Sequence, residues 1–426
     1  MLDMILEVLR ASEADAWEVT DERVHGWEMY MIRHRMDQNR TRRVRHVNVK
    51  VYRKSADGKY LGSAGAEIPP TATREEAEKQ VERLCTYAGY VRNPMYALNR
   101  PDGEGRVEAR GGDVQVHDMM RDFLETMRAV PESAEADLNS YEIFTEEVRL
   151  RYVNSEGVDV ESVHPRSMVE AVVNARRDGH EIELYRMYHS GSCDREGLCR
   201  SLEETMRFGV DRLDASALPE GGKMPVVFST DAAVQIYRWF IERMNAAMQY
   251  RKISDWTPGT PVSEDMRGDR LTVEAVLSLP NSSCNGEFDA EGARIRPMVL
   301  IRDGVAGEVW GSRQFCQYLG IEKGCMPGNF AVSGGTCSAE DLRRGPCLEV
   351  VEFSDFQVNS MNGDIAGEIR LGYYHDGEKT VPVTGGSVSG SMKDFVRDMH
   401  ASREQRQYDR FLIPSVTRLE QVTVAI

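Results

Sequence analysis

The sequence lacks an apolar run long enough to cross a membrane. None approaches the roughly 18 residues that a spanning helix needs. We also expect no secretion signal, because the first residues, MLDMILEVLRASEAD, are amphipathic and acidic rather than basic and then apolar. These absences predict a cytoplasmic chain that does not contact a membrane.

Paired cysteines are missing as well. Eight cysteines are scattered over 426 residues, with no Cys-x-x-Cys pair, so we expect them to be reduced. The nearest two, Cys193 and Cys199, have no His-x-His or second cysteine pair nearby that would complete a zinc site. We therefore expect no metal at this pair.

The sequence is also not basic overall. Lys and Arg number 53 against 69 Asp and Glu, which gives a formal charge of −16. Phosphate contacts dominate the affinity of proteins for nucleic acid, so we expect no nucleic acid as partner. One basic group forms a local exception, which we interpret as a solvated loop and strand edge: Arg40, Arg42, Arg43 and Arg45.

The common catalytic motifs do not occur. There is no phosphate-binding G-x-x-x-x-G-K-[ST] loop and no G-x-S-x-G elbow, and the glycine-rich segment 384–391 (TGGSVSGS) is interpreted as a bend between strands. The one His-Glu dipeptide, His180-Glu181, is followed by Leu184 and Tyr185 where a zinc-binding helix would place its second histidine. The alternation around it indicates a strand.

The chain is long enough for two or three domains. The segment 214–225 (DASALPEGGKMP) breaks every pattern and marks the best boundary. We predict two domains, residues 1–217 and 218–426, and an α+β fold. An N-terminal α/β domain with strand-helix alternation would precede a β-rich, barrel- or sandwich-like C-terminal domain with one prominent helix.

Periodicity places individual elements. Alternating apolar residues predict strands over 46–52, 60–68, 148–152 and 182–184. Helical spacing predicts helices from a Thr73…Glu76 capping box to about residue 88, over 194–213 and over 231–250. Ser229 or Thr230 is the expected N-cap of the third helix. The Gly-rich and charged segment 101–113 predicts a loop.

An ordered series of short motifs resembles the TldD/PmbA family. Residues 288–292 (FDAEG) and 301–305 (IRDGV) resemble its "fDxEG … ie-x-Gv" signature, 359–365 (NSMNGDI) resembles "vn-x-x-tGdfs", and 388–391 (VSGS) resembles "isGn". The resemblance covers roughly residue 140 to the C-terminus. Within these motifs, some residues are interpreted as structural turns: Gly292, Asn362, Gly363 and Gly390.

The sequence departs from the family at the zinc helix. TldD-type subunits resemble zinc peptidases with a His-Glu-x-x-x-His motif after a "pVV" strand, whereas TldE or PmbA subunits lack it. Matching that strand without gaps puts Arg238 and Arg243 at the histidine positions and Trp239 at the glutamate position. Arginine has no lone pair with which to ligate zinc. No cysteine follows Cys347 to serve as the further ligand that the resemblance suggests.

The resemblance therefore implies a non-catalytic subunit that forms a heterodimer with a TldD-like subunit of a zinc metalloprotease. That system would process or degrade unstructured peptides, and the dimer would enclose an extended peptide. No catalytic or metal-binding residue and no cofactor are expected in this chain, and zinc is expected in the partner. Two alternatives stay open: an autonomous metallopeptidase whose ligands meet only in the fold, and a homodimeric binding or regulatory module, as the family's label "modulator of DNA gyrase" suggests.

Two groups of charged residues have open interpretations. Asp289 and Glu291 would share one strand face, either as acid–base groups or, as we favour, as carboxylates that stabilise the turn. Arg238 and Arg243 would form the solvated edge of a core helix, or a surface that meets the active site of a partner.

Overall fold

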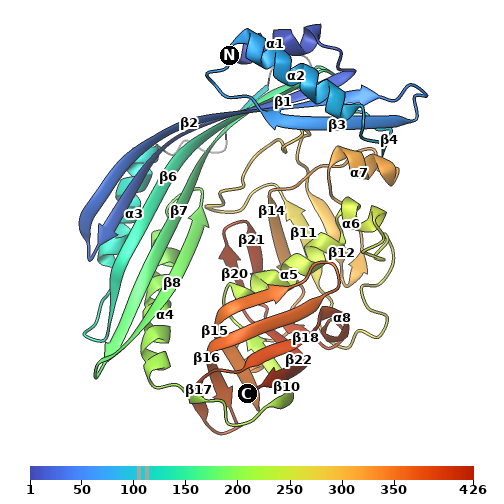
Figure 1. The fold of residues 1–426 in the computed structure, drawn as a ribbon. Coiled ribbons are helices and arrows are strands. Elements are labelled where there is room, and N and C mark those ends of the chain that lie inside the picture. The colour runs from blue at the N-terminus through green and yellow to red at the C-terminus, as the bar shows by residue number, and fades with distance from the viewer. Residues whose placement is uncertain (103–106, 111–114) are drawn as a thin grey trace.

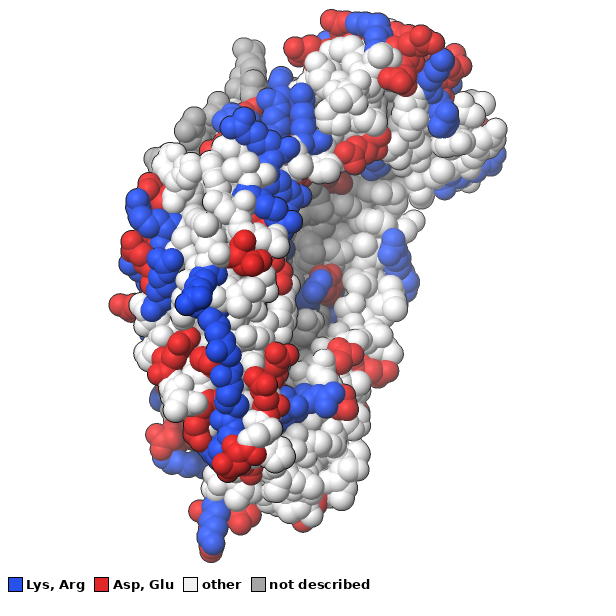
Figure 2. Space-filling model, turned by 60° about the vertical axis from the view of Figure 1, so that its left-hand side comes forward, with Lys and Arg blue, Asp and Glu red and all other residues white. Residues whose placement is uncertain are grey.

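The computed structural model describes residues 1–102, 107–110 and 115–426. Its N-terminal part is a long, curved sheet with helices on one face, and its C-terminal part packs beside the sheet (Figure 1). The strands of the described residues fall into three sheets, of which the first contains β1 to β8 and the other two share β9 to β22. Seen from the side of β2, the surface is hollowed between the two parts (Figure 2).

The first sheet has the order β4-β3-β2-β1-β6-β7-β5, with β8 on β7. Its long members pair antiparallel: β1 (Ala16–Ile32), β2 (Arg35–Lys54), β6 (Ala136–Asn154), β7 (Asp159–Arg177) and β8 (His180–Ser190). The shorter members are β3 (Tyr60–Glu67), β4 (Asn93–Pro94) and β5 (Val107–Arg110). Arg33 and His34, both with positive φ, form the tight turn between β1 and β2.

Two pairs of helices cover separate parts of one face of this sheet. α1 (Leu2–Ala11) and α2 (Arg74–Ala88) pack on valines of β1 and β2. α3 (Val116–Ala129) and α4 (Arg195–Leu213) pack on the other end of the sheet, on β6 and β7. The capping box before α2 and the helix over 194–213 are confirmed, the latter with Asp194 as its N-cap.

Three local expectations in this half were wrong or incomplete. The expected loop over 101–113 lies partly outside the described residues, and its segment Val107–Arg110 is a strand that pairs parallel with β7. The arginine group 40–45 is not a loop, because it lies inside β2 and alternates between the two faces of the sheet. The expected strand edge is confirmed, since β3 pairs only with residues 48–54 of β2. α1, β1 and α3 were not predicted.

The C-terminal part contains a closed barrel. Its strands follow the order β15-β10-β22-β18-β16, and an additional β15–β16 pairing closes the ring: β10 (Gly222–Phe228), β15 (Cys347–Val358), β16 (Asp364–His375), β18 (Ser387–Ser391) and β22 (Thr417–Ala425). The strands β9 (Ser216–Ala217), β17 (Thr380–Thr384) and β19 (His400–Ala401) attach to it. The predicted α+β class with a barrel-like second half is confirmed.

A smaller sheet lies beside the barrel, in the order β13-β12-β11-β14-β21-β20. Its members are β11 (Thr272–Val276), β12 (Met298–Arg302), β13 (Val305–Ala306), β14 (Asn329–Ser333), β20 (Gln405–Tyr408) and β21 (Phe411–Pro414). Among the described residues, the structure has no helix with the length and apolarity to span a bilayer.

The expected helix over 231–250 is two helices, α5 (Ala232–Arg243) and α6 (Ala246–Tyr250). The chain breaks there because the Asn245 side chain accepts the Ala247 N–H at 2.9 Å and starts a new helix. The expected N-cap was wrong: Asp231 occupies that position, while the hydroxyls of Ser229 and Thr230 donate to β15.

Candidate functional site

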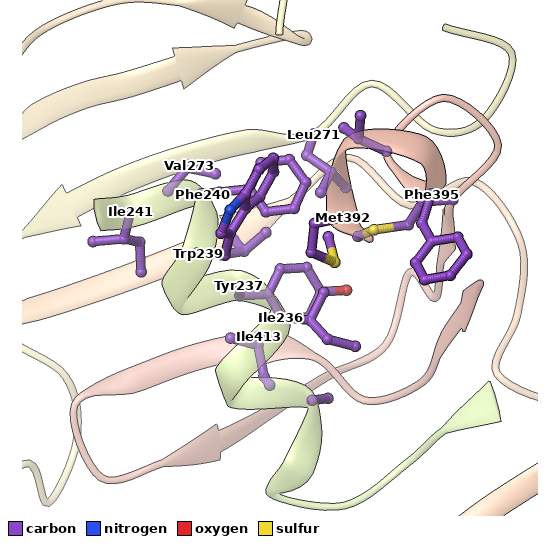
Figure 3. Packing of buried hydrophobic residues seen from close by; sticks show 14 of the residues in the cluster. Ile236, Tyr237, Trp239, Phe240, Ile241, Leu271, Val273, Met392, Phe395 and Ile413 are labelled. Carbon is purple, nitrogen blue, oxygen red and sulfur yellow. The ribbon is translucent and has the colours of Figure 1, made fainter. Parts of the chain in front are cut away.

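The candidate site is the helix α5, which follows the barrel strand β10. Its residues Ile236, Tyr237, Phe240 and Ile241 are almost fully buried, because apolar side chains recur at helical spacing and face the core. Figure 3 shows them packed with residues of β11, β21 and the short helix α8 (Met392–Phe395). The helix is therefore a fixed part of the core.

Arg243, at the second histidine position, is buried inside this core with only 4% of its surface exposed. Its guanidinium lies 5.4 Å from the Trp239 ring and 5.0 Å from the Trp256 ring. It donates to Asp255 at 2.5 Å and to the Ile253 carbonyl at 3.2 Å. The sequence interpretation of Arg243 as part of a solvated edge was wrong, because two indole rings enclose its cationic group.

Arg238 and Trp239 occupy the other two positions and have different environments. The Arg238 side chain is 56% exposed, and its Nε lies 3.9 Å from Glu242. Burial raises the pKa of Glu242, while Arg238 and Arg410 oppose this shift. Trp239 is buried, and its indole N–H has no hydrogen-bond partner among the residues that the structure describes.

These residues do not fit a zinc ion. Zinc needs lone pairs from imidazole, thiolate or carboxylate, but a guanidinium is cationic and an indole N–H only donates. In the described part of the chain, no group of three or more His, Cys, Asp or Glu side chains is arranged to hold a metal. We therefore derive no catalytic step through a metal held by this helix.

Two glycines of the family motifs lie against buried aromatic rings of α5 and α8. A Cβ at Gly363 would lie 3.2 Å from the Trp239 indole nitrogen, and the Gly363 carbonyl accepts the Met392 N–H at 2.7 Å. Gly390 follows the same pattern, because a Cβ there would lie 2.1 Å from the Phe395 ring. Asn362 closes the turn before β16, because its side-chain amide donates to the Asp364 carboxylate and accepts the Asp364 backbone N–H. These residues allow close packing against α5 and α8.

Asp289 stabilises a turn, which is the interpretation we favoured, but it does not stand on a strand face. One carboxylate oxygen accepts the N–H groups of Glu291 and Ala293, both at 2.9 Å, and the other accepts that of Met326 at 2.9 Å. Burial nevertheless raises the pKa of Asp289, against the effect of these hydrogen bonds. With both oxygens committed to backbone donors, Asp289 holds two loops together.

Glu291 and Gly292 connect the turn to the N-terminal sheet. Gly292 has φ +69°, and a Cβ there would lie 2.6 Å from the Tyr152 ring. The Glu291 carboxylate accepts the Arg313 N–H at 2.7 Å, and its carbonyl accepts from Asn99 at 3.0 Å. Burial raises the pKa of Glu291 to about 7; the charges of Asp289 and Glu18 add to this shift, and Lys50 and the Arg313 hydrogen bond oppose it.

This environment predicts a pH dependence of stability. Because the pKa of Glu291 is higher in the folded chain than its ordinary 4.5, the folded state binds the proton more tightly, and stability falls as pH rises from about 4.5 to about 7. The contribution reaches about 3 kcal/mol. Urea unfolding at pH 5 and pH 8 should show a smaller pH difference in Glu291→Gln, which keeps the acceptor, than in the unaltered chain. Equal pH differences would contradict this assignment.

Sequence reasoning missed the residues that complete these two environments. Asp255 and Trp256 surround Arg243 from a loop after α6, and Glu18 accepts hydrogen bonds from Tyr52 and Tyr152 at 2.7 and 2.8 Å beside the Gly292 turn. The second set is far in sequence from the turn that it supports, and the first follows its arginine by a spacing that matches no motif. An Asp-Trp pair twelve residues after an arginine carries no signal by itself.

Comparisons with known proteins give matches to the C-terminal half and to the whole fold. Residues 221–426 match the family model of the PmbA/TldA metallopeptidase C-terminal domain. Metalloprotease PmbA of Escherichia coli O157:H7 is 24% identical over 182 residues, which cover 42% of this chain and 40% of that protein. The matched segment thus spans less than half the length of that relative.

Two solved structures are similar over their whole length. TldE from Thermococcus kodakarensis superposes with a TM-score of 0.75 at 14% identity, over 100% of both chains. A proposed modulator of DNA gyrase from Thermotoga maritima gives 0.75 at 16% identity, over 100% of this chain and 99% of that one. At such identities the likeness demonstrates a common fold.

Proposed function

We propose that this chain, whose residues 221–426 match the PmbA/TldA C-terminal domain, is a member of the PmbA/TldD family. Within that family, it is a subunit without a zinc site of its own in a peptide-processing metalloprotease. The observation that carries the proposal is Arg243: a buried guanidinium between two tryptophans stands where the resemblance places a zinc-binding histidine. A cation enclosed there would repel a metal ion rather than bind it.

The catalytic zinc then belongs to a TldD-like partner, with which this chain forms a heterodimer around an extended peptide. The hollow between the two parts of the molecule offers a place for such a chain (Figure 2). Free backbone groups at sheet edges bind extended peptides with little dependence on sequence. We place the complex in the cytoplasm, in keeping with eight free cysteines.

The test is reconstitution with a TldD-like subunit from the same genome. Size-exclusion chromatography of the mixture should give a one-to-one complex, and cleavage of an unstructured peptide should appear only in the mixture. A stable homodimer that ignores the partner would favour a separate binding module. Cleavage by this chain alone would favour an autonomous peptidase. Either result would contradict the proposal.

A further inference from the structure

One band of the first sheet is not covered by either helix pair. α1 and α2 pack on one end of the sheet face, and α3 and α4 pack on the other. Between them, the same face of β2, β1 and β6 carries charged side chains instead of apolar ones. Figure 2 brings the side of β2 forward and shows Lys and Arg side chains gathered in groups on it.

The strand register places three arginines of this band in one row. Arg23 on β1 lies directly opposite Arg45 on β2 and directly opposite Arg149 on β6. Neighbouring strands are about 4.8 Å apart, and like charges directly opposite each other destabilise a sheet. The next row adds Arg43, opposite His25. The arrangement is therefore unfavourable unless anions compensate it.

The carboxylates that the structure describes supply only part of that compensation. Asp21, 2% exposed, accepts from Arg45 at 2.7 and 2.8 Å and from Arg23 at 2.8 Å. Arg149 pairs with Glu161 at 2.5 Å. Because these two carboxylates are buried beneath the arginines, the guanidinium groups form the outer surface. Arg43 has no hydrogen-bond or ion-pair partner within the described residues.

A cavity lies over this row. Its volume is about 620 Å³, and its lining includes His25 and the charged residues Arg23, Arg43, Arg45, Glu147 and Arg149. A second cavity of about 350 Å³ adjoins it and shares Arg23 and Arg149. Among the described residues that line the first cavity, four arginines outnumber one carboxylate, although the whole chain has a charge of −16.

We propose that this cavity binds a small oligophosphate, with Arg43 and Arg23 as direct ligands to its oxygens. The planar guanidinium fork matches phosphate geometry. The backbones of Arg45 and Arg149, two strands apart, are about 10 Å from each other, and a row of arginines over that width suits linked phosphate groups better than a single anion. The negative net charge of the chain and Glu147 at the cavity disfavour a long nucleic acid.

The test is isothermal titration calorimetry of the full chain with inorganic pyrophosphate at low salt. Arg43→Gln leaves no carboxylate unpaired, and Arg23→Gln leaves Asp21 with its two bonds from Arg45, so both variants should fold. Each should bind pyrophosphate about tenfold more weakly. The matched control is Arg302→Gln, which removes the same charge from an exposed position on β12 of the C-terminal half.

The expected result is one site per chain, a tenfold loss in both cavity variants, no loss in the control, and citrate at least tenfold weaker than pyrophosphate. No measurable binding at millimolar pyrophosphate would overturn the proposal. Equal losses in all three variants would show unspecific charge attraction, and equal affinity for citrate would show a general anion site; both would overturn it. The test uses this chain alone, so its result is independent of the heterodimer.

Discussion

Replacing Arg243 with alanine should lower the free energy of unfolding by about 2–4 kcal/mol. The guanidinium fills the space between Trp239 and Trp256, at 5.4 and 5.0 Å from their rings, so its removal leaves a cavity and ends two cation–π contacts. Asp255 is 86% exposed and is hydrated when the pair is lost, so the cost comes from packing. Urea unfolding monitored by tryptophan fluorescence measures the change.

Arg238→Ala is the matched control on the same helix. Its side chain is 56% exposed and lies 3.9 Å from Glu242, so we expect a change within about 0.5 kcal/mol. The sequence-based interpretation treats both arginines as one solvated edge and predicts small, equal effects. Equal losses in the two variants would contradict the enclosed position of Arg243.

Gly292→Ala should separate the Asp289–Gly292 turn from the N-terminal sheet. Alanine at φ +69° is strained by about 1 kcal/mol, and its Cβ would lie 2.6 Å from Tyr152 and 2.7 Å from Val158. Tyr152 has no room to move, because it is buried and its hydroxyl donates to Glu18 at 2.8 Å. Together, strain and overpacking should cost about 3 kcal/mol or more, and limited proteolysis between the two parts should become faster.

Gly320→Ala is the control that measures the stability cost of a positive φ without a close contact at the new Cβ. Gly320 has φ +74°, but nothing lies within 4 Å of the place where a Cβ would stand. We therefore expect the conformational cost alone, about 1 kcal/mol, and no change in proteolysis between the parts. If Gly292→Ala and Gly320→Ala lowered stability equally, the close contact of Gly292 with Tyr152 would be contradicted.

The sequence predicted those parts of the fold that local rules determine. The capping box before α2 and the apolar spacing of α4 depend on residues three or four positions apart. The sequence did not predict β1, because Asp21 and Arg23 interrupt the apolar face that the alternation of a strand would show. Their compensation comes from Arg45 and other strands, which no local pattern reveals.

The candidate site was predictable in its chemistry but not in its geometry. The residue types at 238, 239 and 243 are enough to argue against zinc ligands. The burial of Arg243 depends on Trp256, and the position of the Gly292 turn depends on Tyr152, which is 140 residues earlier. Such contacts follow from tertiary packing, which no local pattern shows. For this reason the sequence predicted a solvated edge at Arg243, whereas the structure encloses its guanidinium.

The most direct test of the central claim is the zinc content of the purified chain, measured by elemental analysis beside a peptidase assay with added zinc. We predict less than about 0.1 zinc per chain and no cleavage, because the helix offers guanidinium and indole groups in place of ligands. Stoichiometric zinc with cleavage by the chain alone would contradict the account, since this chain would then be the enzyme.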